Sequence, residues 1–317
     1  MRKIERILMP TDFSECADRA LTHAIYLAKQ FQAELHLLNV IVLHDEDPAM
    51  AQFPDHDALF QRLGEISASK MRDRLGAYAS SPLQIVEHRK RGTASAPEIA
   101  AFAEEQGIDL IVMGAHGRRG WRRFLLGSVA EEVVRTAPCP VLTLRDQGED
   151  PALQEVGDIV VPVDLSEPSR QTLTAAKELA AIYGARIHLV HVVAAPFYPT
   201  FYSGFAGAFD YSFPNLAVQL SEALTDWYTT TDGPTIDFDV KILEGQPAQE
   251  ITEYAQKTGA GLIVLATHGT TGWEHALLGS VSEKVVRMAD CPVLTLRFAN
   301  QEDADATRQA ESVGASS

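Results

Sequence analysis

Gly114-Ala-His-Gly117 is followed by nine residues and then by Gly127-Ser128. An apolar run, Leu110 to Met113, precedes this stretch, and Val129 to Val134 after it has helical spacing. We therefore predict a strand, a glycine-rich loop and a helix N-terminus. Glycines let the backbone approach an anion closely, and the free N–H groups of a helix N-terminus attract negative charge. The pattern favours a phosphate-binding loop whose helix is capped by Ser128.

The same pattern occurs again 152 residues downstream, as Ala266-Thr-His-Gly269, nine residues and Gly279-Ser280. Other segments repeat at the same offset: Ile7 to Ser14 matches Ile159 to Ser166, and Cys139 to Arg145 matches Cys291 to Arg297. Repetition on this scale indicates a tandem duplication. We expect one domain at residues 1–146, a polar linker at 147–156, a second domain at 157–298 and a disordered tail at 299–317.

Each copy alternates apolar strands with amphipathic helices. In the first copy, strands are expected near 6–9, 34–40, 83–90, 108–113 and 141–145, and helices near 14–31, 58–79, 97–106 and 128–136. This order predicts the doubly wound α/β class, a mostly parallel sheet with helices on both faces. Ligands of such sheets bind beyond the carboxyl ends of the strands. Asp12, after the first strand, would face the glycine loop if the first and fourth strands are neighbours.

Composition narrows the classes of function. The chain has 317 residues and a formal net charge of −16, which argues against nucleic acid as a partner. No apolar run reaches the roughly 20 residues that span a bilayer, and the N-terminus lacks a signal-peptide pattern, so we expect a cytoplasmic protein without membrane contact. Three cysteines form no disulfide framework, and the acidic residues at 44–57 suit a solvated loop better than a metal site.

The repeated segments resemble the universal stress protein family in its tandem form. The resemblance rests on Pro-x-Asp after the first strand, the glycine loop after the fourth, and Cys-Pro-Val-Leu-Thr-Leu-Arg at the last strand of both copies. It implies two doubly wound domains, each with a mostly parallel five-stranded sheet of order 3-2-1-4-5. It also implies a dimer contact through the last strand, made within one chain as a pseudo-dimer or between chains as a homodimer.

Binding of ATP or a related adenine nucleotide, in a stress-response or regulatory role, is what the resemblance implies about function. Asp12, Asp164 and the backbone near Val40 and Val192 would hold the adenosine, and the glycine loops would hold the phosphates. The implied contacts of the first copy are Pro10, Thr11, Asp12, Val40, Met113, Gly114, His116, Gly117, Arg118, Arg119, Gly127, Ser128 and Val129. Those of the second copy are Pro162, Val163, Asp164, Val192, Ala266, His268, Gly269, Thr270, Gly279, Ser280 and Val281.

The two loops differ in charge. The nine residues after Gly117 include four arginines (Arg118, Arg119, Arg122, Arg123), whereas those after Gly269 include none and carry Glu274. Because arginine binds phosphate oxygens with a planar fork, we expect the first site to bind ATP more tightly. The second would bind it more weakly or prefer a less charged adenine ligand. Ala266 replaces Gly114, so the second loop must also differ if Gly114 has a positive φ.

Two other functions remain open. A slow Mg²⁺-dependent ATPase could use Asp12 and Ser128 at the metal, but no Walker lysine follows the glycines and no base stands out, so no catalytic residue is predicted. The second alternative is a partner-binding module in which the nucleotide is structural. It would use residues 197–213, a segment with eight aromatic residues found only in the second copy.

Overall fold

The computed structural model describes residues 3–43, 56–78, 81–117, 126–145, 156–194, 213–267 and 279–298. The first copy forms β1 (Arg6–Pro10), α1 (Glu15–Phe31), β2 (Glu34–Val42), α3 (His56–Leu75), a 3-10 turn (Gly76–Tyr78), β3 (Ile85–Gly92), α4 (Ser95–Glu105), β4 (Leu110–Gly114), α5 (Ser128–Thr136) and β5 (Val141–Leu144). The second forms β6 (Asp158–Pro162), α6 (Glu167–Tyr183), β7 (Arg186–Ala194), α7 (Phe213–Thr230), β8 (Phe238–Gly245), α8 (Pro247–Thr258), β9 (Leu262–Ala266), α9 (Ser280–Met288) and β10 (Val293–Leu296).

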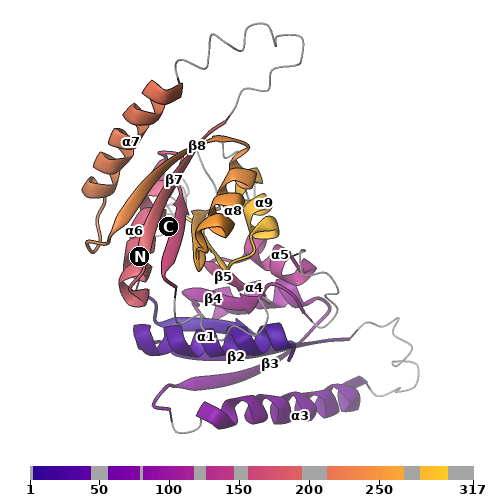
Figure 1. The fold of residues 1–317 in the computed structure, drawn as a ribbon. Helices are drawn as coiled ribbons and strands as arrows, with labels where there is room; N and C mark the ends of the chain where they lie inside the picture. Colours follow the sequence, from indigo (N-terminus) through magenta and orange to yellow (C-terminus); the bar gives the residue numbers. More distant parts are fainter. Residues whose placement is uncertain are drawn as a thin grey trace, which may run out of the picture.

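All ten of these strands belong to one sheet, in the order β3-β2-β1-β4-β5-β10-β9-β6-β7-β8 (Figure 1). Within each half the neighbouring strands are parallel, and both halves have the predicted order 3-2-1-4-5. The halves meet where β5 pairs antiparallel with β10, with Leu142 opposite Leu294. The doubly wound class and the pseudo-dimer through the last strand are therefore confirmed, but the two predicted sheets are continuous.

Hydrophobic cores lie on both faces of the sheet and run through both halves. One core holds the inner faces of α1, α3, α6 and α7, and the other holds those of α4, α5, α8 and α9. Side chains alternate between the cores along each strand: Ile7 and Met9 of β1 enter the first, and Leu8 enters the second. Burial on both faces explains why the strands are almost continuously apolar.

Polar contacts match across the seam between the halves. Thr143 donates to the Val293 carbonyl and Thr295 to the Val141 carbonyl, both at 3.2 Å. Arg145, buried after β5, donates to two carbonyls in the last turn of α9 at 2.9 and 2.6 Å. A cation at a helix C-terminus satisfies free carbonyls and complements the helix dipole. Each half thus donates hydrogen bonds to backbone carbonyls of the other.

Some predicted boundaries shift. The helix expected at 58–79 ends at Leu75 and continues only as a 3-10 turn. The one expected from Pro97 begins at Ser95, because proline is tolerated in the first helical turn, where N–H groups have no intrahelical partner. The expected tail and most of the linker lie outside the described residues, although Val156 is buried in the core. In the described part of the chain, no helix is both long and apolar enough to cross a bilayer.

A buried histidine pairs with a half-buried tyrosine across the seam. His23 on α1 is 4% exposed, and its Nε2 lies 2.9 Å from the hydroxyl of Tyr183 on α6. Within the described residues its Nδ1 has no hydrogen-bond partner. Burial lowers the pKa of His23 from 6.5 to about 4, so the folded protein holds this ring neutral.

The free energy of unfolding should therefore fall as the pH drops from about 6.5 towards 4, since the unfolded chain binds a proton at His23 before the folded chain does. At pH 4.5 the loss attributable to His23 should be about 2–3 kcal/mol relative to pH 7. The His23→Gln variant keeps a side chain that can accept the tyrosine proton but cannot titrate. Urea unfolding of both proteins at the two pH values measures the difference, and identical pH dependence would contradict the assignment.

Candidate functional site

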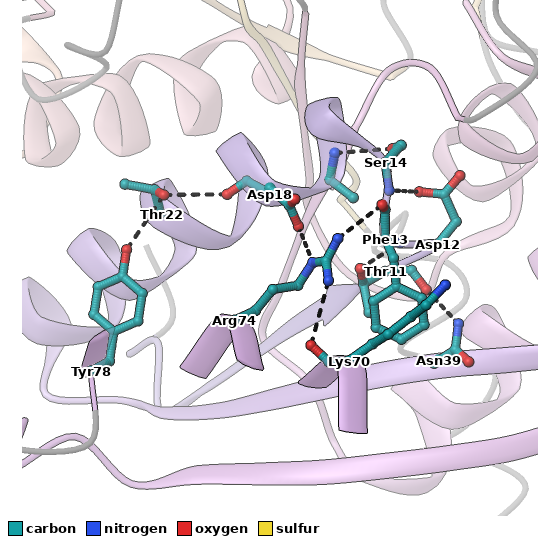
Figure 2. A network of polar contacts seen from close by, with 11 residues as sticks. Thr11, Asp12, Phe13, Ser14, Asp18, Thr22, Asn39, Lys70, Arg74 and Tyr78 are labelled. Carbon is teal, nitrogen blue, oxygen red and sulfur yellow. Dashed lines mark hydrogen bonds and ion pairs between the residues drawn. The ribbon is translucent and has the colours of Figure 1, made fainter. Parts of the chain in front are cut away.

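The turn after β1 is fixed by its own side chains. The Thr11 hydroxyl accepts the Phe13 N–H at 3.0 Å, and the Asp12 carboxylate accepts the Ser14 N–H at 3.0 Å (Figure 2). Ser14 then caps α1 by accepting a backbone N–H of the first turn at 3.2 Å. These bonds hold the Asp12 carboxylate at the carboxyl end of β1, where doubly wound proteins bind ligands.

Phe13 has a left-handed backbone, with φ of 65°. Such a conformation is costly for a bulky residue and persists only where the surroundings enforce it. Two cations of α3 do so: Lys70 and Arg74 lie 5.3 and 5.1 Å from the centre of the Phe13 ring. Arg74 also donates to the Phe13 carbonyl at 3.0 Å and forms an ion pair with Asp18 (Figure 2).

Asn39 ties β2 to the same turn. Its side-chain amide donates to the Thr11 carbonyl at 2.7 Å and accepts the hydroxyl of Ser67, on α3, at 2.9 Å. All three residues are buried, so these bonds are protected from water. Val40, the next residue of β2, is half-buried. The β2 backbone expected to contact adenosine is therefore fixed relative to the turn that carries Asp12.

The glycine loop closes on itself between β4 and α5. Ala115 donates its N–H to the Leu144 carbonyl and accepts that of Gly127, both at 2.7 Å. Gly127, not Ser128, is the N-cap residue, because its backbone is extended while Ser128 is already helical. The predicted capping role of Ser128 is thus wrong. Among the described residues no side chain caps α5, which leaves the N–H groups of its first turn suited to an anion.

Asp12 lies against the first part of the glycine loop. Strands β1 and β4 are neighbours, which is the condition stated from the sequence. A Cβ atom added at Gly117 would lie 2.7 Å from the Asp12 carboxylate. Because Gly117 has no side chain, the Asp12 carboxylate lies directly beside the loop backbone.

Glycine is needed at position 114 because space there is limited, and not because of its backbone conformation. Its φ is not positive. A Cβ atom there would lie 2.8 Å from the sulfur of Cys16 and 3.1 Å from its backbone carbon, so only glycine fits without a shift. In the second copy Pro168 takes the place of Cys16, and alanine stands at position 266.

The second copy repeats these backbone arrangements. The Asp164 carboxylate accepts the Ser166 N–H at 3.1 Å, and Leu165 repeats the left-handed backbone with φ of 63°. Gly279 donates to the Thr267 carbonyl at 2.7 Å and is the N-cap of α9, which no side chain of the described part of the chain caps. In both halves, a strained acidic turn thus lies beside a loop that leads into a helix with glycine at its N-cap.

Side chains unique to the second copy add contacts. Ser169 donates to the Asp164 carboxylate at 2.6 Å, where the first copy has Ala17. The Ser282 hydroxyl donates to the Ala266 carbonyl at 2.7 Å. His191, at the place of Asn39, lies with Nδ1 2.8 Å from the Val163 carbonyl. The second acidic group is therefore already bound to a hydroxyl within the protein.

The remaining predicted residues lie as follows. Pro10, Thr11, Met113 and Val163 are buried; Asp12, Val40, Gly114, His116, Gly127, Pro162, Asp164, Val192, Ala266 and Gly279 are half-buried; Gly117, Ser128, Val129, Ser280 and Val281 are exposed. Arg118, Arg119, His268, Gly269 and Thr270 lie outside the described residues, as do Arg122, Arg123, Glu274 and most of 197–213.

Several contributors were missed from the sequence. Lys70 and Arg74 lie on α3, far from Asp12 along the chain. No local sequence pattern therefore links them to the turn that carries Asp12. Asn39 and Ser169 could have been noticed by comparing the copies, because their counterparts are His191 and Ala17.

Cys139 and Cys291, which occupy matching positions in the two copies, are not reactive thiols. Burial raises the pKa of both Cys139 and Cys291 to about 12, which leaves the thiolate that would react unpopulated near neutral pH. Both are free, buried thiols.

Known proteins resemble this chain in both sequence and fold. The universal stress protein family model matches residues 3–145 and 155–297. Universal stress protein MJ0531 of Methanocaldococcus jannaschii is 35% identical over 143 residues, covering 44% of this chain and 82% of that protein. Universal stress protein YxiE of Bacillus subtilis is 30% identical over 146 residues, covering 44% of this chain and 98% of that protein.

A solved universal stress protein structure from Archaeoglobus fulgidus aligns with a TM-score of 0.65 over 94% of this chain and 98% of that one. The identity is 21%, so this likeness concerns the fold alone. Since the two segments matched by the family model span most of the sequence, the chain belongs to the universal stress protein family, as a tandem of two such domains.

Proposed function

We propose that this protein binds ATP or a related adenine nucleotide at the carboxyl ends of its strands and serves a regulatory role in stress. The observation that carries the proposal is the position of Gly117, whose missing side chain leaves the Asp12 carboxylate facing the glycine loop. A carboxylate suits hydroxyl or amino donors of an adenosine, whereas an uncapped helix N-terminus suits phosphate. The two chemistries meet in one crevice.

Binding rather than turnover is the activity proposed. Phosphoryl transfer needs groups that orient the attacking nucleophile and neutralise charge on the transferred phosphate. The chain has no Walker lysine after its glycines. Three free, buried cysteines fit a reducing compartment, which supports a cytoplasmic location.

The Gly117→Ala variant tests the crevice. Its new methyl group would meet the Asp12 carboxylate at 2.7 Å, so the carboxylate must move. We expect ATP affinity at the first site to fall about tenfold, or 1.4 kcal/mol, with the melting temperature little changed. Gly64→Ala on α3 is the matched control, because nothing lies within 4 Å of the added methyl group. Titration calorimetry that gave equal losses, or none, in both variants would refute the proposed crevice.

The two sites should differ in affinity. Four arginines follow Gly117, whereas none follows Gly269 and Glu274 lies in its loop sequence. With the second site blocked by Gly269→Asp, the remaining site should bind ATP at least about tenfold more tightly than the site left by Gly117→Asp. Replacing ATP with AMP should narrow the gap, because fewer phosphate charges reach the loop. Equal affinities in the two variants would contradict the predicted asymmetry.

A further inference from the structure

A groove of about 430 Å³ lies at the seam between the halves. One wall belongs to the first half and includes Asp109, which precedes β4, with Pro138 and Pro140, which precede β5. The other wall belongs to the second half and includes Thr174 of α6 and Arg297, which follows β10. The volume is within the usual range for small-molecule sites, about 300–1,000 Å³. None of the lining residues belongs to either proposed nucleotide site.

Asp109 supplies a fixed negative charge in this groove. One oxygen of its carboxylate, Oδ2, accepts the backbone N–H groups of Glu5 and Arg6 at 2.9 and 3.0 Å. Among the described residues, the other oxygen accepts no hydrogen bond and the carboxylate has no ion-pair partner. A carboxylate held in this way can accept a donor from a ligand with little further loss of side-chain freedom.

Arg297 supplies a positive charge from the opposite wall. The residue is exposed, and its guanidinium donates one hydrogen bond of 3.3 Å, to the Ala137 carbonyl. Because a guanidinium has five N–H donors, most of them are unused by the described part of the chain. They are available to an anionic group of a ligand.

Both charges lie near the short connection between α5 and β5. Arg297 bonds to the Ala137 carbonyl at the start of this connection. At its end, the Pro140 carbonyl accepts the N–H of Ile111, two residues after Asp109, at 2.9 Å. Three extended residues span at most about 10 Å, so the two charges are separated by the length of a small molecule. A ligand that carries one charge of each sign could therefore meet both.

The pseudo-symmetric position of the seam does not offer this pair. Gly261 stands where Asp109 would be, and a Cβ atom added there would lie 3.1 Å from the Cα atom of Val156. Arg145, the counterpart of Arg297, is 7% exposed and already donates two hydrogen bonds to carbonyls of α9. We therefore expect one such site in the chain, and not two.

We propose that this groove binds a free α-amino acid with an aliphatic side chain, whose ammonium group pairs with Asp109 and whose carboxylate pairs with Arg297. A guanidinium matches a carboxylate in a bidentate geometry, and ionised donors strengthen the hydrogen bonds at both ends. Pro138, Pro140 and Phe298 provide apolar contact for the side chain. A simple acid or amine would leave one of the two protein charges without a partner.

Titration calorimetry with L-leucine tests the proposal on the full chain. The protein should bind one equivalent. N-acetyl-L-leucine, which lacks the ammonium group, and L-leucinamide, which lacks the carboxylate, should each bind at least about tenfold more weakly. Saturating ATP should not displace L-leucine, because the groove shares no residue with the proposed nucleotide sites.

Two variants assign the ends of the ligand. Asp109→Asn keeps an oxygen that can accept the two backbone N–H groups, and it should weaken L-leucine binding about tenfold without weakening that of N-acetyl-L-leucine. Arg297→Gln should weaken L-leucine binding about tenfold without weakening that of L-leucinamide. Arg135→Gln, which removes an exposed arginine outside the groove, should have no effect.

Circular dichroism checks that every variant is folded, and the two leucine derivatives test the charge pairing on the unaltered protein. Absence of L-leucine binding, or its displacement by ATP, would overturn the proposal. Full affinity for L-leucine in either Asp109→Asn or Arg297→Gln would do the same, as would equal binding of L-leucine and its two derivatives.

Discussion

The antiparallel pairing of β5 with β10 is the contact on which the rest of the molecule depends. It turns two parallel five-stranded sheets into one, and it covers the edge that each half would otherwise expose. The cores on both faces then run through the seam. Arg145 extends the contact to the last turn of α9, and Arg287 of that helix pairs with Glu131 of α5 at 2.8 Å. The duplication thus builds a dimer-like body from one chain.

The order of the strands then decides where a ligand can bind. Because β1 and β4 are adjacent and parallel, the turn after one and the loop after the other open into the same space, and the second half repeats this with β6 and β9. Both turns keep a bulky residue in a left-handed conformation, at Phe13 and Leu165. Strain repeated at equivalent places beside an acidic group is typical of functional sites. The second half adds a hydroxyl contact from Ser169 to its acidic side chain, where the first half has Ala17.

The fold was largely predictable from sequence, because the repeated glycine loop, the alternation of elements and the family resemblance agreed. The site was predictable only in outline. Asp12 and Gly117 were placed together by topology, but the N-cap was assigned one residue late because its position depends on backbone bonding at Gly127. Glycine is needed at position 114 because Cys16 lies close to it, and the left-handed backbone of Phe13 is stabilised by a cation of α3. Such tertiary contacts leave no periodic signal.

Nucleotide binding at the repeated crevices is the central claim, and native mass spectrometry of the freshly purified full chain tests it most directly. Ligand released from the protein on unfolding should have the mass of an adenine nucleotide, and the apo protein incubated with ATP should gain up to two nucleotide masses. Nucleotide binding would be contradicted if the bound molecule contained no adenine. It would also be contradicted if the apo protein gained no mass when incubated with ATP in large excess over the protein.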